Sequence, residues 1–200
     1  MSTSKQLPLI HLARHAETAW TKTGQHTGLT DLPLTERGER NACRLGERLK
    51  GVTVTQVFVS PLQRATRTCE LAGFSAGAII DRDLVEWNYG EYDGKRLAEI
   101  HEQRPGWELF RDGCPGGESV TDVAIRAHRV INRLRALDGD SLIFSSSHFL
   151  RVFAACWLGL EPAAGRHFFL GTSALSTVGY DHGLGDPVVR LWNDCSHDGD

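Results

Sequence analysis

Short apolar runs recur along this 200-residue chain, and segments with a different periodicity separate them. The runs are rich in Val, Ile, Leu and Phe and end in polar residues, which is typical of buried strands. They predict strands over residues 7–13, 54–59, 142–144, 177–180 and 188–192.

Helical spacing of apolar residues appears between these runs. Apolar residues three to four positions apart follow Thr35 and again occupy residues 120–137, so both segments are predicted to form amphipathic helices. Ser60 and Pro61 follow the second predicted strand, as an N-cap and a proline at the first helical position would. They predict a further helix that ends at Leu71.

The alternation of strands and helices predicts an α/β fold of three layers, with a mainly parallel sheet between helices on both faces. Residues 81–117 are rich in Gly, Trp and charged residues without clear periodicity, and we expect loops with one or two short helices there. No linker or repeat divides the chain. We therefore expect residues 1–200 to form one domain, with the loops of residues 81–117 covering its active site.

Polar clusters follow three of the predicted strands, at residues 14–15, 60–64 and 145–148. In sheets of this kind, ligands bind outside the carboxyl ends of the strands. The last cluster contains three serines and a histidine, but the G-x-S-x-G elbow of a serine hydrolase does not accompany it. The clusters therefore predict a ligand site at one edge of the sheet and argue against a serine hydrolase.

Composition narrows the expected partners and compartment. The net charge of −3 offers no general attraction to nucleic acid or to an anionic membrane surface. No apolar run reaches the about 18 residues of a membrane span, and the first residues lack the pattern of a signal peptide. Five cysteines without a CxxC pair predict neither a zinc site nor a disulfide framework. These features favour a reduced, cytoplasmic protein.

The candidate chemistry begins with Arg14 and His15, directly after the first predicted strand. An isolated pair of this kind is most often a polar loop, but an imidazole can attack phosphorus while a guanidinium holds the phosphoryl oxygens. Arg64 alone would suggest a surface residue; together with Arg14 it predicts an anion pocket. Glu86 stands between apolar neighbours, which disfavours carboxylate charge and suits a proton donor, although a loop ion pair is the simpler alternative.

Several motifs, in chain order, resemble those of the histidine phosphatase superfamily, also called the phosphoglycerate mutase-like family. They are Arg14-His15-x-Glu17-Thr18-x-Trp20, GQHTGLTDLPLTERGE, SPLQRATRT, LVEWNYGEYDG and RDGCPGGES. The resemblance covers nearly the whole chain, from Leu9 to Trp192, and is strongest to the short sugar-phosphate phosphatases. It implies the three-layer phosphoglycerate mutase-like fold.

The resemblance also implies a role for each matching position. His15 would be the phosphorylated nucleophile. Arg14 and Arg64 would hold the phosphoryl group, and Glu86 would be the proton donor. The positions at which family members contact the substrate are occupied here by Thr21, Thr27, Gly28 and Tyr89. No metal and no cofactor is expected, because arginines and histidines supply the positive charge.

The chain departs from the family pattern at the second histidine. The family motif is His-Gly-x-x-x-Arg, and counting back from Arg151 places Ser146 at the histidine and Ser147 at the glycine. His148 follows directly. We expect these three residues at the substrate, with the Ser146 hydroxyl a poor substitute for an imidazole, so that turnover is weakened. Thr21 stands where mutases carry asparagine, which favours the phosphatase branch.

Three functional hypotheses follow. The leading one is a phosphomonoesterase that hydrolyses a small phosphorylated metabolite, a sugar phosphate or bisphosphate, through a phosphohistidine. The alternatives are a catalytically degraded protein that binds a phospholigand or inorganic phosphate, and a phosphoglycerate mutase-type phosphotransferase. A homodimer is compatible with the sequence, which leaves the oligomeric state open.

Overall fold

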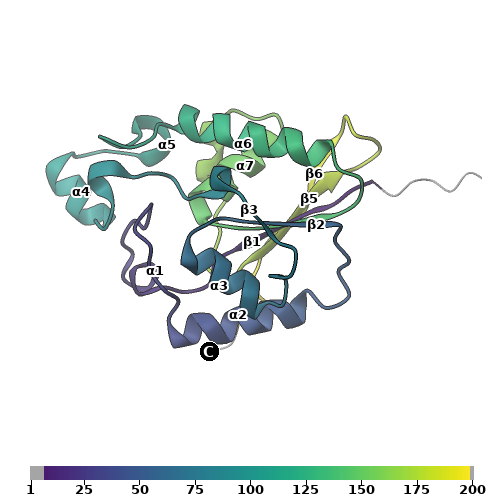
Figure 1. Ribbon diagram of the computed structural model, residues 1–200. Helices are drawn as coiled ribbons and strands as arrows, with labels where there is room; N and C mark the ends of the chain where they lie inside the picture. Colours follow the sequence, from purple (N-terminus) through teal and green to yellow (C-terminus); the bar gives the residue numbers. More distant parts are fainter. Residues whose placement is uncertain (1–6, 199–200) are drawn as a thin grey trace, which may run out of the picture.

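A six-stranded sheet runs through residues 7–198, the part of the chain that the computed structural model describes (Figure 1). Its strands are β1 (Ile10–Arg14), β2 (Gln56–Val59), β3 (Ile79–Ile80), β4 (Ser141–Ser145), β5 (Leu175–Tyr180) and β6 (Pro187–Asp194). They lie in the order β3-β2-β4-β1-β5-β6, parallel from β3 to β1 and antiparallel from β1 to β6. The prediction of a mainly parallel α/β sheet is confirmed.

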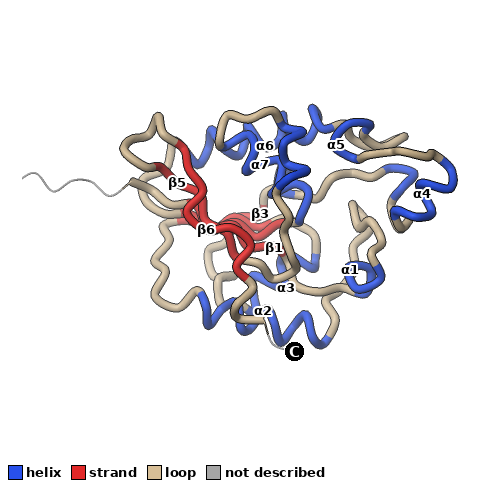
Figure 2. Tube along the Cα trace, turned by 180° about the vertical axis from the view of Figure 1, so that it is seen from behind, coloured by secondary structure: helices blue, strands red, loops and turns tan. Residues whose placement is uncertain are grey.

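Helices cover both faces of this sheet, as both views of the chain show (Figure 1, Figure 2). They include α2 (Glu36–Arg48) and α3 (Gln63–Leu71) on one face, and α6 (Val120–Arg135) and α7 (Ser147–Trp157) on the other. Successive strand residues point to opposite faces, so Leu12 packs with α6 and α7 while Ala13 packs with α2 and α3. No helix in residues 7–198 has the length and apolar character needed to cross a membrane.

The predicted start of α3 was wrong, because a distant residue supplies its cap. The backbone N–H of Ser60 donates to Phe144 O at 3.0 Å and so extends the ladder between β2 and β4. The helix begins only at Gln63, after Leu62, which makes no capping bond. The carboxylate of Asp31 accepts from the Gln63 backbone N–H at 2.8 Å instead. A capping partner 32 residues away leaves no local trace in the sequence.

Short elements occupy the segment of residues 81–117, as expected, and three further ones lie outside the predicted strands and helices. The segment holds η1 (Arg82–Leu84), η2 (Gly90–Tyr92), α4 (Leu97–Gln103) and α5 (Leu109–Asp112). The elements that sequence periodicity missed are α1 (Ala19–Thr23), η3 (Pro162–His167) and the two-residue strand β3. All three are too short to show a period.

Arg126 of α6 holds the segment of residues 81–117 to the body of the protein. Its guanidinium donates to the carbonyl groups of Asp83 and Val85 and forms an ion pair with Glu118 at 2.8 Å. Glu118 in turn accepts from the backbone N–H of Asn88 at 2.8 Å. These bonds fix the backbone on both sides of Glu86, and they are made by groups largely shielded from water, where hydrogen bonds are strong.

Candidate active site

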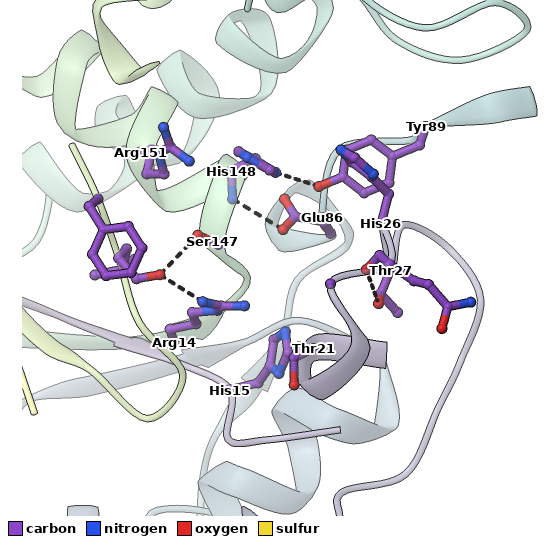
Figure 3. A pocket seen from close by; sticks show the side chains of 14 residues that line it. Arg14, His15, Thr21, His26, Thr27, Glu86, Tyr89, Ser147, His148 and Arg151 are labelled. Carbon is purple, nitrogen blue, oxygen red and sulfur yellow. Dashed lines mark hydrogen bonds between the residues drawn. The ribbon is translucent and has the colours of Figure 1, made fainter. Parts of the chain in front are cut away.

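The carboxyl ends of β2, β4 and β1 lie side by side, and a cavity lies at the end of β1. Arg14, the last residue of β1, pairs in register with Ser145, the last residue of β4. The cavity has a volume of about 230 Å³, and Figure 3 shows its wall. The polar clusters expected at the strand ends therefore come together, which is the arrangement of ligand sites in sheets of this kind.

Most of the residues singled out from the sequence line this cavity. Those in its wall are Arg14, His15, Thr21, Thr27, Glu86, Tyr89, Ser147 and His148, whereas Arg64, Gly28 and Ser146 lie behind it. The wall residues come from β1, α1, the loops before and after it, the segment of residues 81–117, and α7.

His15 follows β1 directly and is 2% exposed. Its Nδ1 lies 2.8 Å from the carbonyl oxygen of Ala16, which can only accept, so Nδ1 carries the ring proton. Burial lowers the pKa of His15 well below its usual value, and the charges of Arg64 and Arg14 lower it further. The ring is therefore neutral, with a free lone pair on Nε2, which is the form a nucleophile requires.

Arg14 brings a guanidinium into the cavity beside His15 (Figure 3). Its Nη1 donates to the carbonyl oxygen of Leu170 at 2.6 Å, while its buried Nε has no partner among the described residues. Burial lowers the pKa of Arg14, but an arginine remains protonated in proteins. A buried positive charge with spare donors is suited to bind an anion.

Arg64 is fully buried and acts from behind the wall. Its guanidinium donates to the carbonyl groups of Thr27, Gly28 and Thr30, at 3.1, 2.7 and 3.0 Å, and so holds this loop in place. Its charge reaches His15, whose pKa it lowers more than Arg14 does. In this structure Arg64 therefore contributes charge to the site and shape to the loop, and its Nε is left without a partner among the described residues.

Gly28 supports the wall from the same loop. A methyl group at this position would lie 2.9 Å from the carbonyl oxygen of Trp87 and 3.0 Å from the ring of Tyr89. Contacts that short require the backbone or the ring to move. The glycine thus lets Tyr89 approach the loop, and it serves the site through Tyr89 rather than through the cavity itself.

Glu86 projects toward the cavity from the segment of residues 81–117 and meets the start of α7. Its Oε1 accepts from the backbone N–H groups of Trp87 and Phe149 at 2.8 and 2.9 Å. Its Oε2 accepts from the backbone N–H of His148 at 3.1 Å. The apolar neighbours expected from the sequence are accompanied by three backbone donors, two of them from the N-terminus of a helix, where negative charge is favoured.

Tyr89 and His148 form a short hydrogen bond in the wall of the cavity, with 2.5 Å between the phenol oxygen and Nδ1 (Figure 3). Burial raises the pKa of Tyr89 and lowers the pKa of His148, so both groups are neutral. We assign the phenol as the donor. The proton of the His148 ring then lies on Nε2, which has no protein partner among the described residues and is free to donate to a ligand.

Ser146 and Ser147 lie at the start of α7, at the positions where the motif resemblance led us to expect a histidine and a glycine. Ser146 is the N-cap residue and is fully buried, and its hydroxyl bonds to no described residue. The hydroxyl of Ser147 lies in the wall and donates to Leu170 O at 3.2 Å. No imidazole from position 146 can therefore reach a ligand, and His148 is the histidine that α7 presents to the cavity.

Thr21 connects α1 to the wall. Its hydroxyl donates to the carbonyl oxygen of Thr18 at 3.0 Å and accepts from the Thr18 backbone N–H at 2.9 Å. The Thr18 hydroxyl accepts from the Thr21 backbone N–H in return, which makes a capping box for this short helix. Thr21 is thus a structural residue of α1 that also borders the cavity.

Other wall residues were not among the candidates from the sequence. They are Gly24, Gln25, His26, Arg151, Phe169 and Leu170. Arg151 lies three residues after His148, a spacing that places both on one face of a helix, and this signal could have identified it. His26 lies in a motif quoted above. Phe169 and Leu170 enter from the loop before β5, and no local pattern marks them.

The whole chain can be compared with known proteins at this point. Residues 10–195 match the histidine phosphatase superfamily (branch 1). The sedoheptulose 1,7-bisphosphatase of Saccharomyces cerevisiae is 36% identical over 185 residues, which cover 76% of this chain and 68% of that protein. An acid phosphatase of Mycobacterium tuberculosis is 35% identical over 177 residues, which cover 86% of this chain and 87% of that protein.

A solved structure shows the same fold. The protein of an open reading frame from Mycobacterium tuberculosis superimposes with a TM-score of 0.89 at 33% identity, over 94% of this chain and 98% of the other.

The fold and the site together define a protein of the phosphoryl-transfer class. More narrowly, the chain belongs to the histidine phosphatase superfamily, and it is a phosphatase, a phosphoric monoester hydrolase. The family, the three-layer fold and the reaction class expected from the motifs are confirmed.

Proposed function

We propose that this protein hydrolyses a small phosphorylated metabolite, a sugar phosphate or bisphosphate, in two steps through a phosphohistidine at His15. The observation that carries the proposal is the state of His15: buried, neutral, with Nδ1 held by a carbonyl and Nε2 free. The names of the yeast and mycobacterial relatives support phosphate esters as the substrates, and one of these relatives is a sugar bisphosphatase.

In the first step, Nε2 of His15 attacks phosphorus, and the bond from phosphorus to the ester oxygen breaks. Glu86 gives a proton to the departing alkoxide, which leaves as an alcohol. In the second step, Glu86 takes a proton from water, the water oxygen attacks phosphorus, and the bond to Nε2 breaks. Inorganic phosphate leaves, and His15 and Glu86 return to their initial states.

The two arginines balance the negative charge of the transferred phosphoryl group. Arg14 offers donors in the cavity wall, and Arg64 adds its charge from behind. We propose a reaction without metal or cofactor; in residues 7–198 no group of three or more His, Cys, Asp or Glu side chains is placed to hold a metal ion. Preorganised positive donors of this kind stabilise charge that develops in the transition state.

Glu86 gives a proton in the first step of this cycle and takes one in the second. Three backbone N–H groups hold its carboxyl group in place for both steps.

The remaining candidates contact or support the substrate in this proposal. Thr21, Thr27, Tyr89, Ser147 and His148 would contact it from the wall, while Gly28 and Ser146 act from behind. We also propose that residues 1–200 act as one domain with residues 81–117 over the site, in the cytoplasm, without nucleic acid or membrane as partner. A homodimer is the proposed assembly.

A panel of phosphorylated metabolites tests the function. Purified protein should release inorganic phosphate from at least one sugar phosphate or bisphosphate. Phosphoryl transfer between positions of one substrate would instead show a mutase. Thermal stabilisation by phosphate without release from any ester would show the degraded, ligand-binding protein that Ser146 suggests.

The pH dependence of kcat/KM should show an acidic optimum. Because the pKa of His15 is depressed, the imidazole stays neutral as the pH falls through 6.5, and the acid limb should appear only below that value. The rate should decrease toward alkaline pH, because the first step requires a proton for the departing alkoxide. A rate that is flat from pH 5 to pH 9 would contradict the pairing of the two residues.

A further inference from the structure

The loop of residues 168–174, which precedes β5, supports both Arg14 and His15. Its Leu170 carbonyl oxygen accepts from Nη1 of Arg14 at 2.6 Å (Figure 3). The backbone N–H of Ser173 donates to the carbonyl oxygen of His15 at 3.2 Å. The position of this loop therefore determines where the guanidinium of Arg14 and the backbone of His15 lie.

The last residues of β6 hold this loop in place. The indole nitrogen of Trp192 donates to Phe169 O at 2.7 Å. The side-chain oxygen of Asn193 accepts from the backbone N–H of Gly171, also at 2.7 Å. These two bonds flank Leu170, so they fix the carbonyl group that accepts from the guanidinium.

His197, beyond the end of β6, holds the same loop at Ser173. Its Nε2 lies 3.0 Å from Ser173 O, which can only accept, so Nε2 carries a proton and donates it to this bond. The side chain of His197 is 6% exposed, and its Nδ1 has no partner among the described residues. Through the backbone of Ser173, the ring of His197 is thus connected to the backbone of His15.

The backbone is strained at two of these contacts. Ser173 and Asn193 are the two non-glycine residues with positive φ within residues 7–198, at 58° and 57°. A side chain disfavours this conformation, which persists only where surrounding contacts impose it. The pairing of β5 with β6 is also irregular beside Asn193, where β6 carries one extra residue. Outliers and bulges of this kind gather next to active sites, which indicates a function for these contacts.

We propose that Asn193 and His197 are positioning residues of the phosphatase reaction. Through the loop of residues 168–174, Asn193 fixes the guanidinium of Arg14, which binds the phosphoryl group. Through the same loop, His197 fixes the backbone of His15, which carries the nucleophilic imidazole. The cavity wall includes neither Asn193 nor His197. This inference rests on the function proposed above and adds to it residues that act from outside the cavity.

Replacing His197 with alanine should lower kcat about 10-fold, because a small displacement of a reacting group costs this much or more. The Kd of inorganic phosphate should stay unchanged, because Arg14 keeps its partner. His197→Gln, whose amide can donate in place of Nε2, should restore most of kcat. The measurements are steady-state kinetics on the best substrate of the panel and calorimetry with phosphate, at a temperature at which thermal unfolding shows each variant to be folded.

Asn193→Gly tests the other contact. Glycine adopts positive φ readily, so this variant removes the side-chain acceptor and keeps the backbone conformation. The Kd of inorganic phosphate should rise about 10-fold, as the loss of one hydrogen bond that holds Arg14 implies. The matched control is Arg48→Gln, which breaks the 2.9 Å ion pair between Arg48 and Asp194 and leaves the loop untouched. It should change neither kcat nor the Kd.

Three results would overturn the proposal. One is a folded His197→Ala variant with the kcat of the wild type. Another is a loss of kcat that His197→Gln does not restore, because packing and not the hydrogen bond would then be the cause. The third is an Asn193→Gly variant that binds phosphate as Arg48→Gln does. Should His197→Ala not fold, His197→Asn takes its place, because the shorter amide keeps the polarity but not the reach of Nε2.

Failure of this inference is distinguishable from failure of the proposed function. Wild-type protein that releases phosphate through His15, with variants that all behave like Arg48→Gln, would retain the function and lose the positioning role. Wild-type protein without phosphate release would lose the function. Weaker phosphate binding by Asn193→Gly would then still support the positioning of Arg14, and unchanged binding would overturn it.

Discussion

Replacing His15 with alanine is expected to abolish phosphate release, with kcat lower by on the order of 10⁴-fold or more. The alanine removes the only protein atom in the proposal that bonds to phosphorus. The arginines that remain can bind the ester but cannot open the two-step route. The variant should still bind substrate, because Arg14 and Arg64 are unchanged. Phosphate release under saturating substrate is the measurement.

A matched control distinguishes the loss of the nucleophile from the loss of any histidine. His128 lies exposed on α6, away from the cavity, and His128→Ala should leave the rate unchanged. Rapid quenching of the wild type with labelled substrate should trap a phosphohistidine that His15→Ala lacks. Substantial turnover by His15→Ala, or a label on another residue, would rule out the proposed intermediate.

Replacing Ser146 with histidine is expected to raise kcat by about 10²-fold or more, because one preorganised donor to a developing negative charge contributes this much. The Ser146 hydroxyl has no hydrogen-bond partner among the described residues, so the substitution breaks no side-chain bond. Steady-state kinetics on the best substrate of the panel is the measurement. Thermal unfolding should accompany it, since position 146 is fully buried and a larger side chain must be accommodated.

Ser146→Asn is the control, because it adds bulk and polarity without an imidazole and should not give the rise. The pairing of Ser146→His with His148→Ala then tests compensation. If His148 supplies the missing donor in the wild type, its removal should cost more there than in the Ser146→His background. A folded Ser146→His variant with unchanged activity would show that the serine is not what limits turnover.

The sequence by itself determined the layers of the fold and the place of Arg14 and His15 in the candidate site. Strands show a period of two or continuous apolar runs and helices a period near 3.6, so their order could be predicted without the structure. Arg14 and His15 could be placed for the same reason, because they follow β1 directly. Arg64 and Glu86 were candidates from their sequence context, and the motif resemblance gave them expected roles. In the structure the charge of Arg64 acts on His15, and Glu86 lines the cavity.

The tertiary structure alone decided how these side chains divide their roles. Arg64 donates its hydrogen bonds to the loop of residues 27–30. Tyr89, which is 59 residues away in the sequence, forms a hydrogen bond with His148. The carbonyl partners of Arg151 also emerge only there, since neither Gly165 nor Arg166 follows from helical spacing. Local sequence patterns predict the secondary structure of a segment. A counter-ion, a helix cap or a hydrogen-bond partner can come from a residue far away in the sequence, so it is known only once the chain has folded.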